Sequence, residues 1–386
     1  MNKRDFIKGV GLFSAASVAS AIDANAQENR IPERSSSFFN VRDFGAKGDG
    51  KTNDSVAIQS AIDKAGQVEG VVYFPSGKYI CGGLKMHPHT TLLGDAQWIF
   101  RTEQHGAVLI LDSAERDCMI DITGAFGARI KGLTLEGIRD AKKEIHGIFL
   151  NNKKYAKKED THVIDDVKVQ KFSGHGLYLK RSWLFIIRHS QFMANKGCGV
   201  MLEGWDGFVT DNQFSGNGSH GFGCENHGAT VMFTANRVEW NKGCGLYIPD
   251  GNTWNITGNS FDRNWGAGLK IGKNKGNTTG ISVTGNVFRR CGKDPSTLGN
   301  GEISANVIFE NARGLSFVGN AFRAGRDDGG KGKFTPEYGF AIKNIDYSVV
   351  SNNVLHLGYM KDILLDFGGH GKNFVFENNV GCPMTK

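Results

Sequence analysis

Short apolar runs alternate with polar residues along most of the chain, and each run follows a glycine. Five successive examples read HGLYL, CGVML, HGFGC, CGLYI and AGLKI. Each run is too short for a helix, alternates with period two and is bounded by Gly or Asn, which is typical of a β-strand. The pattern therefore predicts many short strands and few helices.

A phrase containing asparagine recurs between these strands, at first with a period of about 22 to 24 residues. Its copies read TDNQF, TANRV, TGNSF, TGNVF, VGNAF, SNNVL and ENNV. Self-similarity at this period indicates a solenoid. Three short strands per coil, each stacked on its equivalent in the next coil, predict one all-β domain over residues 39–386, a single-stranded right-handed parallel β-helix.

The recurring asparagines are predicted to be structural. Asn tolerates the left-handed backbone region and its side chain can bond nearby backbone, so it suits a corner that every coil repeats. One predicted ladder contains Asn212, Asn236, Asn259, Asn286, Asn320, Asn353 and Asn379, with Ser190 in the coil before. A second corner contains Asn195, Asn217, Asn241 and Asn264.

Residues 1–26 have the pattern of a secretory signal peptide. A charged start, MNKRDFIKG, precedes the apolar stretch VGLFSAASVASA and the small-residue cleavage pattern ANA. The string KRDFIK resembles a twin-arginine export signal with Lys3 in place of the first arginine, so both that route and the Sec route stay open. We expect a secreted or periplasmic protein with a linker over residues 27–38 and no membrane segment.

The segment over residues 39–63, FNVRDFGAKGDGKTNDSVAIQSAID, resembles the opening of the pectate-lyase-like right-handed β-helix superfamily. The nearest resemblance is to the pectate lyase 3, rhamnogalacturonase and epimerase-like motif. The superfamily includes polysaccharide lyases, polygalacturonase-like hydrolases and phage tailspikes, so the resemblance implies carbohydrate as a partner without choosing a reaction. The catalytic motifs of polygalacturonases are not found in their usual order, and those residues are not transferred.

The same segment predicts a short helix that covers the open end of the first coil. Asn53 or Asp54 is placed to cap its start. The residues expected on its apolar face are Val56, Ile58, Ala61 and Ile62.

Strand alternation assigns side chains to the inside or the outside of the predicted coils. The residues expected to point inward are Leu177, Leu179, Val200, Leu202, Phe222, Cys224, Leu246, Ile248, Leu269 and Ile271. The outward column between them is Phe149, Tyr178, Met201, Gly223, Tyr247 and Lys270, followed by a second outward step of Asn151, Lys180, Glu203 and Glu225. The stack formed by His146, His175, Cys198 and His220 is expected to point inward as a core feature.

Gly223 leaves a gap in the outward column between Met201 and Tyr247, which is predicted to seat a sugar ring. The candidate substrate-binding residues around this gap are Trp205, Asp206, Gly223, Asn252, Trp254, Arg263 and Trp265. Indole rings suit the apolar faces of sugars, and polar groups suit their hydroxyls. The alternative is a solvated solenoid face on which aromatic residues pack across coils.

Two chemistries can be built from the candidate catalytic residues. A lyase needs a base near the uronate carboxylate and a positive group that stabilises the enolate. Tyr247 and Lys270 on adjacent coils, with His227 and Arg263 nearby, fit that need, and the nearby cation is expected to lower the tyrosine pKa or to keep a carboxylate bound. Asp250 is also a candidate catalytic residue. A hydrolase needs two carboxylates, which Glu203 and Glu225 supply on adjacent coils.

Charge favours an acidic partner. The formal net charge is +7, and removal of three basic and two acidic residues with the leader leaves +6. We rank a lyase of an acidic polysaccharide first, a glycoside hydrolase second and a non-catalytic glycan-binding or adhesin solenoid third, with epimerisation undecided. No nucleic-acid motif is present.

No cofactor is required by these residues, and no zinc-ligand spacing is found among the seven cysteines. Ca²⁺ near Glu203, Asp206 and Glu225 is an open alternative because clustered carboxylates suit a hard cation. The polysaccharide and the oligomeric state are left open by the sequence.

Overall fold

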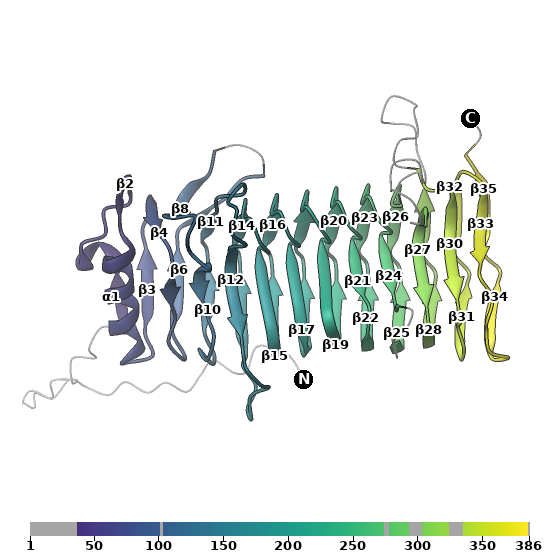
Figure 1. Cartoon of the computed structure of the whole chain (residues 1–386), viewed down its shortest axis with the longest axis horizontal. Coiled ribbons are helices and arrows are strands. Elements are labelled where there is room, and N and C mark those ends of the chain that lie inside the picture. The colour runs from purple at the N-terminus through teal and green to yellow at the C-terminus, as the bar shows by residue number, and fades with distance from the viewer. Residues whose placement is uncertain (1–36, 101–102, 274–277, 293–302, 324–334, 385–386) are drawn as a thin grey trace, which may run out of the picture. The chain divides into compact units, whose positions relative to one another are not determined.

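The computed structural model describes residues 37–100, 103–273, 278–292, 303–323 and 335–384, within one compact unit, Ser37–Lys386. The strands stack coil upon coil in chain order and pair in parallel with their equivalents in the neighbouring coils (Figure 1). The predicted parallel β-helix is therefore confirmed. The expected leader lies outside the described residues, as does the linker up to residue 36.

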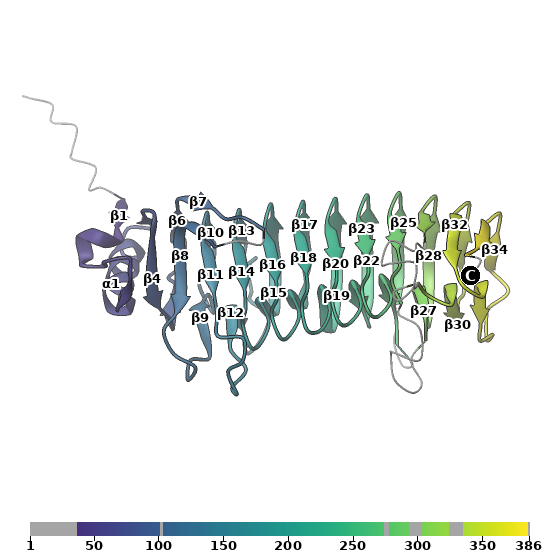
Figure 2. The ribbon, with the colours of Figure 1, turned by 90° about the horizontal axis from the view of Figure 1, so that it is seen from above.

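Each full coil contributes to three faces. The first face contains β5 (Leu84–Lys85), β9 (Cys118–Asp121), β12 (His146–Asn151), the first parts of β15 (Leu177–Arg188), β17 (Val200–Thr210) and β19 (Phe222–Thr234), then β21 (Leu246–Ile248), β24 (Leu269–Ile271), β27 (Ala305–Glu310), β30 (Tyr338–Lys343) and β33 (Asp362–Asp366). In Figures 1 and 2 the long strands β15, β17 and β19 lie side by side in neighbouring coils.

The second face continues from the same coils after a bend. It contains β1 (Phe38–Asn40), β3 (Val71–Phe74), β6 (Thr91–Gly94), β10 (Arg129–Lys131), β13 (His162–Asp165), the last parts of β15, β17 and β19, then β22 (Gly251–Thr257), β25 (Thr278–Thr284), β28 (Ala312–Val318), β31 (Ser348–Ser351) and β34 (Phe374–Glu377). Register shifts after Lys180 and after Leu202 mark where the long strands pass from the first face to the second.

The third face is a separate sheet. It contains β2 (Asp49–Asn53), β4 (Gly77–Cys81), β8 (His105–Leu111), β11 (Thr134–Glu136), β14 (Lys168–Gln170), β16 (Gln191–Met193), β18 (Gln213–Ser215), β20 (Arg237–Glu239), β23 (Ser260–Asp262), β26 (Val287–Arg289), β29 (Ala321–Arg323), β32 (Val354–Tyr359) and β35 (Val380–Pro383). The short strand β7 (Ala96–Gln97) pairs antiparallel with β8.

Both asparagine ladders are confirmed. Asn236 donates to Oδ1 of Asn259 from its backbone N–H at 2.8 Å and from its side chain at 3.1 Å, and its side chain also donates to the carbonyl of Val209. Equivalent hydrogen bonds link each asparagine to the next from Asn212 to Asn379, and the backbone N–H of Ser190 donates to Oδ1 of Asn212. The second ladder connects Asn195, Asn217, Asn241 and Asn264. Because the asparagines pair with one another and with backbone, their burial leaves these polar groups satisfied.

The predicted inward residues fill the core, since all ten are at most 2% exposed. The interior also stacks phenylalanines from successive coils of the third face, such as Phe261 and Phe288 at 4.9 Å between ring centroids. All seven cysteines are free thiols, of which six are buried and Cys382 is exposed. In the described part of the chain, no helix is long and apolar enough to cross a membrane.

Helix α1 (Ser55–Gly66) packs beside the 3₁₀ helix η1 (Val41–Phe44) at the end of the stack formed by the first coil (Figure 1). Ile58, Ala61 and Ile62 are fully buried, but Val56 is 81% exposed, so its predicted place on the apolar face is wrong. Val56 lies two positions from Ile58, and residues that far apart do not share a helix face.

Asp54 occupies the N-cap position of α1 without capping it by a side-chain bond. Its carboxylate instead accepts from the backbone N–H groups of Lys47 and Gly48 at 2.7 and 3.0 Å. Asn53 accepts from the N–H of Ser55 at 2.9 Å. The start of α1 is therefore joined to the preceding turn by two side chains.

Candidate active site on the first face

The predicted outward column on the first face is confirmed by the strand register. Tyr178, Met201, Gly223, Tyr247 and Lys270 are direct partners in successive coils. The column starts from Phe149 and continues beyond Lys270 to Ile308 and Ala341. The register thus places aromatic, apolar and cationic side chains in one line across neighbouring coils.

The gap predicted at Gly223 is already occupied in part by protein. Gly223 is buried, and a Cβ atom added there would lie 3.2 Å from Cδ2 of His220. The His220 ring lies 4.9 Å from the Tyr247 ring at an interplanar angle of 42°. The His220 ring therefore fills part of the gap that was predicted to seat a sugar over Gly223.

The prediction that His146, His175 and His220 point into the core is wrong. The His146 ring stacks on the outward ring of Phe149 at 5.3 Å, and the His175 ring stacks on Tyr178 at 5.6 Å. His175 and His220 lie before the first residues of β15 and β19, in the turn that enters the strand. The period-two rule does not apply in the turn, which explains the error for His175 and His220, whereas His146 is the first residue of β12.

Each of these histidines accepts a backbone hydrogen bond at Nδ1 from the next coil. The donors are the N–H groups of His175, Cys198 and Cys244, at 3.1, 2.9 and 2.9 Å from His146, His175 and His220. Burial lowers the pKa of His146 to about 3 and that of His175 to about 4. Burial, followed by the positive charge of Lys270, lowers the pKa of His220 to about 4. The rings are neutral at physiological pH, and the proton is on Nε2.

This tautomer bears on metal binding. Ligand atoms of Glu144, His146 and His175 lie within 4.8 Å of one another, the single such group of three within the described ranges. Because Nδ1 of both rings accepts a backbone N–H, Nε2 is protonated and has no lone pair for a cation. The carboxylates of Glu203, Asp206 and Glu225, proposed from the sequence for Ca²⁺, do not form such a group.

The two glutamates of the predicted hydrolase pair have different partners. Glu203 is 8% exposed and lies 3.4 Å from Nε of Arg181, and its carboxylate accepts from the side chain of Asn226 at 3.1 Å. Glu225 accepts from the hydroxyl of Tyr178 at 2.8 Å and lies 3.7 Å from Nζ of Lys180. Each carboxylate is thus held by its own cation.

The hydroxyl of Tyr178 is a proton donor in this arrangement. Burial, followed by the hydrogen bond to Glu225, raises the pKa of Tyr178 far above its ordinary value. A phenol with a raised pKa keeps its proton at physiological pH.

An aromatic group lies next to these glutamates. The Trp205 ring stacks on Tyr155 with 3.8 Å between centroids, and Trp183 donates from its indole N–H to Asp206 at 2.9 Å. Sequence reasoning included Trp205 and Asp206 but missed Tyr155 and Trp183. Trp183 pairs with Trp205 in the ladder, so the repeat contained the signal for it.

A pocket of about 460 Å³ opens further along the same face, around Tyr247 and Lys270. Lys242, Glu310 and His220 complete its polar lining. Its apolar floor includes Cys244, Ala267 and Ile308, which belong to a small buried cluster separate from the main core. Nζ of Lys270 lies 5.7 Å from the centre of the Tyr247 ring. We call this the Tyr247 pocket.

Two residues of the Tyr247 pocket, Lys242 and Glu310, were missed from the sequence. Glu310 follows the run ANVIF, which alternates as the earlier strands do and pairs with β24 in register. A longer insertion separates this strand from the regular repeats, so the register was not extended across it. Lys242 lies in the turn before the strand, where alternation gives no direction.

The expected low pKa of Tyr247 is wrong. Burial is the largest influence and raises the pKa of Tyr247, and the nearby Cys244 and Glu310 act in the same direction. The ammonium of Lys270 lies over the ring face, so its charge does not replace the solvation lost by the hydroxyl. Tyr247 is therefore a phenol that can donate a proton, not a phenolate base.

The remaining predicted residues are divided between the rim, the turns and the core. His227 and Asp250 lie 3.8 Å apart in the turns after the first face, and Asn252 is exposed at the start of β22. Trp254 is 2% exposed and donates to the carbonyl of Gly228, so its predicted sugar contact is wrong. It lies in β22, where alternation turns it into the core.

Arg263 and Trp265 lie in the turn after β23. Arg263 donates to Asp262 at 2.6 Å and its guanidinium lies 4.6 Å from the centre of the Trp240 ring, so its charge is held on the side of the third face. Nζ of Lys242 lies 5.2 Å from the centre of the Trp265 ring. Trp265 is thereby next to the Tyr247 pocket, and Arg263 is not among the residues that line it.

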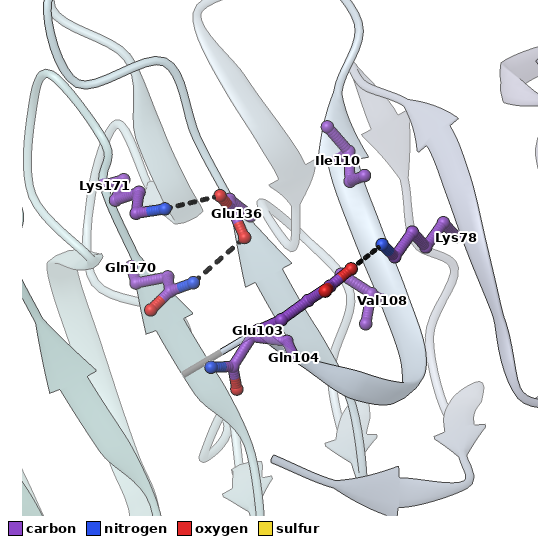
Figure 3. Close-up of a pocket in the computed structure, with 8 residues that line it drawn as sticks. All are labelled: Lys78, Glu103, Gln104, Val108, Ile110, Glu136, Gln170 and Lys171. Carbon is purple, nitrogen blue, oxygen red and sulfur yellow. Dashed lines mark hydrogen bonds and ion pairs between the residues drawn. The ribbon is translucent and has the colours of Figure 1, made fainter. Parts of the chain in front are cut away.

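Another pocket, of about 420 Å³, lies on the third face (Figure 3). Its charged side chains are paired with one another: Lys78 with Glu103, and Lys171 with Glu136 at 2.7 Å. Gln170 also donates to Glu136 at 3.0 Å. The charged side chains of this pocket therefore compensate one another.

The amino-acid sequence matches the family described as rhamnogalacturonase A/epimerase, pectate lyase-like, over residues 38–270. The match covers more than half of the chain, which therefore belongs to this family. The superfamily expected from residues 39–63 is thus confirmed.

Two curated relatives come from Azotobacter vinelandii. The chain is 29% identical over 236 residues to the mannuronan C5-epimerase AlgE5, a match that covers 55% of this chain and 23% of that protein. It is 31% identical over 196 residues to alginate lyase 7, covering 48% of this chain and 23% of that protein. The chain spans about a quarter of the length of these relatives.

Solved structures support the fold. The A-module of the mannuronan C-5 epimerase AlgE6 from Azotobacter vinelandii has a TM-score of 0.59 at 22% identity, covering 90% of this chain and 100% of that chain. The DFA-IIIase from Arthrobacter chlorophenolicus A6, without its lid, has a TM-score of 0.59 at 14% identity, covering 89% and 92%.

Proposed function

We propose that this protein is an enzyme that acts on an acidic polysaccharide by removing the proton next to a uronate carboxylate, most simply as a lyase. The observation that carries the proposal is the Tyr247 pocket, in which two lysines, a glutamate and a protonated tyrosine converge over an apolar floor. The names of the relatives, a mannuronan epimerase and an alginate lyase, agree with such a substrate.

The charges of the pocket suit a uronate. Lys242 and Lys270 outnumber the single carboxylate of Glu310 among its lining residues. A bound uronate carboxylate would compensate the excess positive charge. The two ammonium groups would then stabilise the enolate that forms when the neighbouring carbon loses its proton.

Glu310 and Tyr247 have complementary roles in this proposal. Glu310 accepts the C5 proton, and the electrons of the C–H bond form the enolate. Its collapse makes the C4–C5 double bond and breaks the C4–O bond, and Tyr247 protonates the departing oxygen. Tyr247 suits this acid role because burial keeps its hydroxyl protonated.

An epimerase shares the first half of this sequence. If the enolate is reprotonated at C5 from the opposite side, the glycosidic bond survives and the sugar is inverted. The protonated Tyr247 supplies such a proton as readily as it supplies one to a leaving oxygen. The pocket therefore supports proton abstraction, and the products decide between elimination and epimerisation.

The test is incubation with polymannuronate, alginate or polygalacturonate in D₂O, followed by NMR and mass analysis of the products. A lyase gives unsaturated uronate ends that absorb in the ultraviolet. An epimerase gives an inverted sugar with deuterium at C5. A hydrolase gives saturated reducing ends, and a non-catalytic binding protein gives no product. Either of the last two results, obtained across all three polymers, would refute proton abstraction from a uronate.

Lys270→Met connects the reaction to the Tyr247 pocket. We expect at least a tenfold loss of turnover, because the enolate loses one of its two cations. Lys64→Met is the matched control, since Lys64 is an exposed residue of α1. Equal activity in both variants would place the reaction outside this pocket.

Export to the periplasm or the medium is the location that fits a polysaccharide substrate. We propose it from the sequence of residues 1–26, and cell fractionation with detection of the processed chain tests it.

A further inference from the structure

We propose that His220 is a substrate-positioning residue, whose Nε2–H donates a hydrogen bond to the carboxylate of the uronate held in the Tyr247 pocket. This role rests on the proposed function and assigns a third carboxylate donor beside Lys242 and Lys270. Strand alternation predicts that this ring points inward, away from the substrate.

Geometry fixes the direction of the His220 ring. Nδ1 accepts the backbone N–H of Cys244 at 2.9 Å, which fixes that edge of the ring against the next coil. The other edge carries Nε2–H, and the ring lines the Tyr247 pocket. Gly223 adds no side chain in β19, the strand that follows His220, so the ring occupies that space and lies against Tyr247.

The same backbone contact keeps the donor in one protonation state. A ring that accepts at Nδ1 must carry its proton at Nε2. Burial of the ring, followed by the positive charge of Lys270, opposes a second proton and lowers the pKa of His220 to about 4. His220 is therefore a neutral N–H donor, a type of group that can stabilise a developing oxyanion without exchanging its own proton.

The equivalent histidines of other coils supply an internal control. His146 and His175 accept the same backbone N–H contact at Nδ1, so this contact belongs to the corner of the coil. Neither residue lines the Tyr247 pocket. What distinguishes His220 is its place in the pocket beside two lysines, and a substitution at His146 removes a ring at the same corner without changing the pocket.

Two substitutions separate the two roles of His220, which are to accept the N–H of Cys244 at Nδ1 and to donate Nε2–H to the substrate. His220→Asn keeps an acceptor near the position of Nδ1 for the N–H of Cys244 but withdraws the donor from the pocket. His220→Gln reaches the position of Nε2 with an amide N–H but leaves Cys244 without its acceptor. His146→Asn is the matched control for the loss of a ring at this corner.

The experiment measures kcat and KM on the polyuronate that the wild type uses, binding of a uronate oligosaccharide by calorimetry, and the midpoint of urea unfolding. We expect His220→Asn to unfold near the wild-type midpoint, to bind the oligosaccharide more weakly and to lose about 10- to 100-fold in kcat/KM. His220→Gln should keep more of the activity and lose more of the stability. His146→Asn should keep wild-type kcat/KM.

Wild-type binding and kcat/KM in His220→Asn would overturn this role and leave the proposed function intact. If His220→Asn does not fold, His220→Gln decides, because activity in Gln no better than in His220→Ala would also overturn the role. A wild-type protein that neither binds nor converts any polyuronate would overturn the proposed function together with this role.

Discussion

His146, His175 and His220 each face a glycine of the next coil. Gly174, Gly197 and Gly243 stand opposite His146, His175 and His220, and a Cβ atom at each would lie 2.6 Å from Nδ1 of that ring. Where the coil before carries a cysteine instead, the position is Ile145, Ser219 or Gly266, so a glycine also occurs opposite Cys244. The glycine of the GHG and GCG motifs therefore lets the backbone approach the ring, and it need not be catalytic.

Gly243→Ala tests this relation at the level of one residue. The added methyl group would push the backbone away from His220, and we expect a loss of about 1–3 kcal/mol in the free energy of unfolding. Ser219→Ala, at the equivalent position opposite Cys198, should change it little. The double variant Gly243→Ala with His220→Ala should suffer less from the methyl group than Gly243→Ala alone. If the alanine costs the same with and without the ring, steric contact with His220 is not the cause.

Among the structural elements, α1 shows how an apolar pattern covers an open solenoid end. Ile58, Ala61, Ile62 and Ala65 share one face and are fully buried, while Val56 points to solvent. An uncovered first coil would expose strand edges and core side chains. The helix is thus part of the hydrophobic core, although it lies outside the three faces.

Ile62→Ala should lower the free energy of unfolding by about 2–4 kcal/mol, because it removes buried methylene groups and leaves a cavity under the helix. Val56→Ala, on the exposed side of the same helix, should have little effect. Urea unfolding followed by circular dichroism measures both. Equal effects of the two substitutions would mean that α1 does not cover the coil in solution.

The strands and their register could be predicted because a side chain in a strand points either into the core or to solvent, and the side facing the core is apolar. That rule placed Leu246 inside and Tyr247 outside correctly. It gave the wrong direction for His220 and none for Lys242, because both lie in turns, where strand alternation does not apply. Trp254 was misplaced because its indole suggested sugar, whereas its strand position dictated burial.

At the scale of the whole molecule, the buried neutral histidines make stability depend on pH. The pKa is lowered to about 3 for His146 and to about 4 for His162, His175 and His220, in each case mainly by burial. An unfolded histidine titrates near 6.5. Between that value and pH 4 the unfolded chain binds protons that the folded chain does not, so acid favours unfolding.

We therefore expect the free energy of unfolding to fall as the pH drops from about 6.5 to 4, by about 2–3 kcal/mol for each ring at most. Urea unfolding at several pH values measures this slope. His146→Asn should reduce the slope, since one titrating ring is lost while an acceptor for the backbone remains. An unchanged slope in this variant would show that His146 titrates normally in the folded protein.

The whole coil stack also determines where chemistry is possible, because only neighbouring coils can bring residues distant in sequence together. Lys242 and Tyr247 come from one coil and Lys270 and Glu310 from the next two, yet all four line one pocket. The alternative site, around Glu203 and Glu225, has each carboxylate paired with its own cation. We therefore propose that proton abstraction takes place in the Tyr247 pocket, with Glu310 as the base.

The most direct measurement is the turnover of a polyuronate by Glu310→Gln, compared with Glu377→Gln, an exposed control in β34. An amide cannot accept the C5 proton, so we expect Glu310→Gln to lose at least a hundredfold in kcat. Glu377→Gln should match the wild type. Full turnover in Glu310→Gln, together with its loss in Glu225→Gln, would contradict proton abstraction by Glu310. It would place the reaction around Glu203 and Glu225 instead.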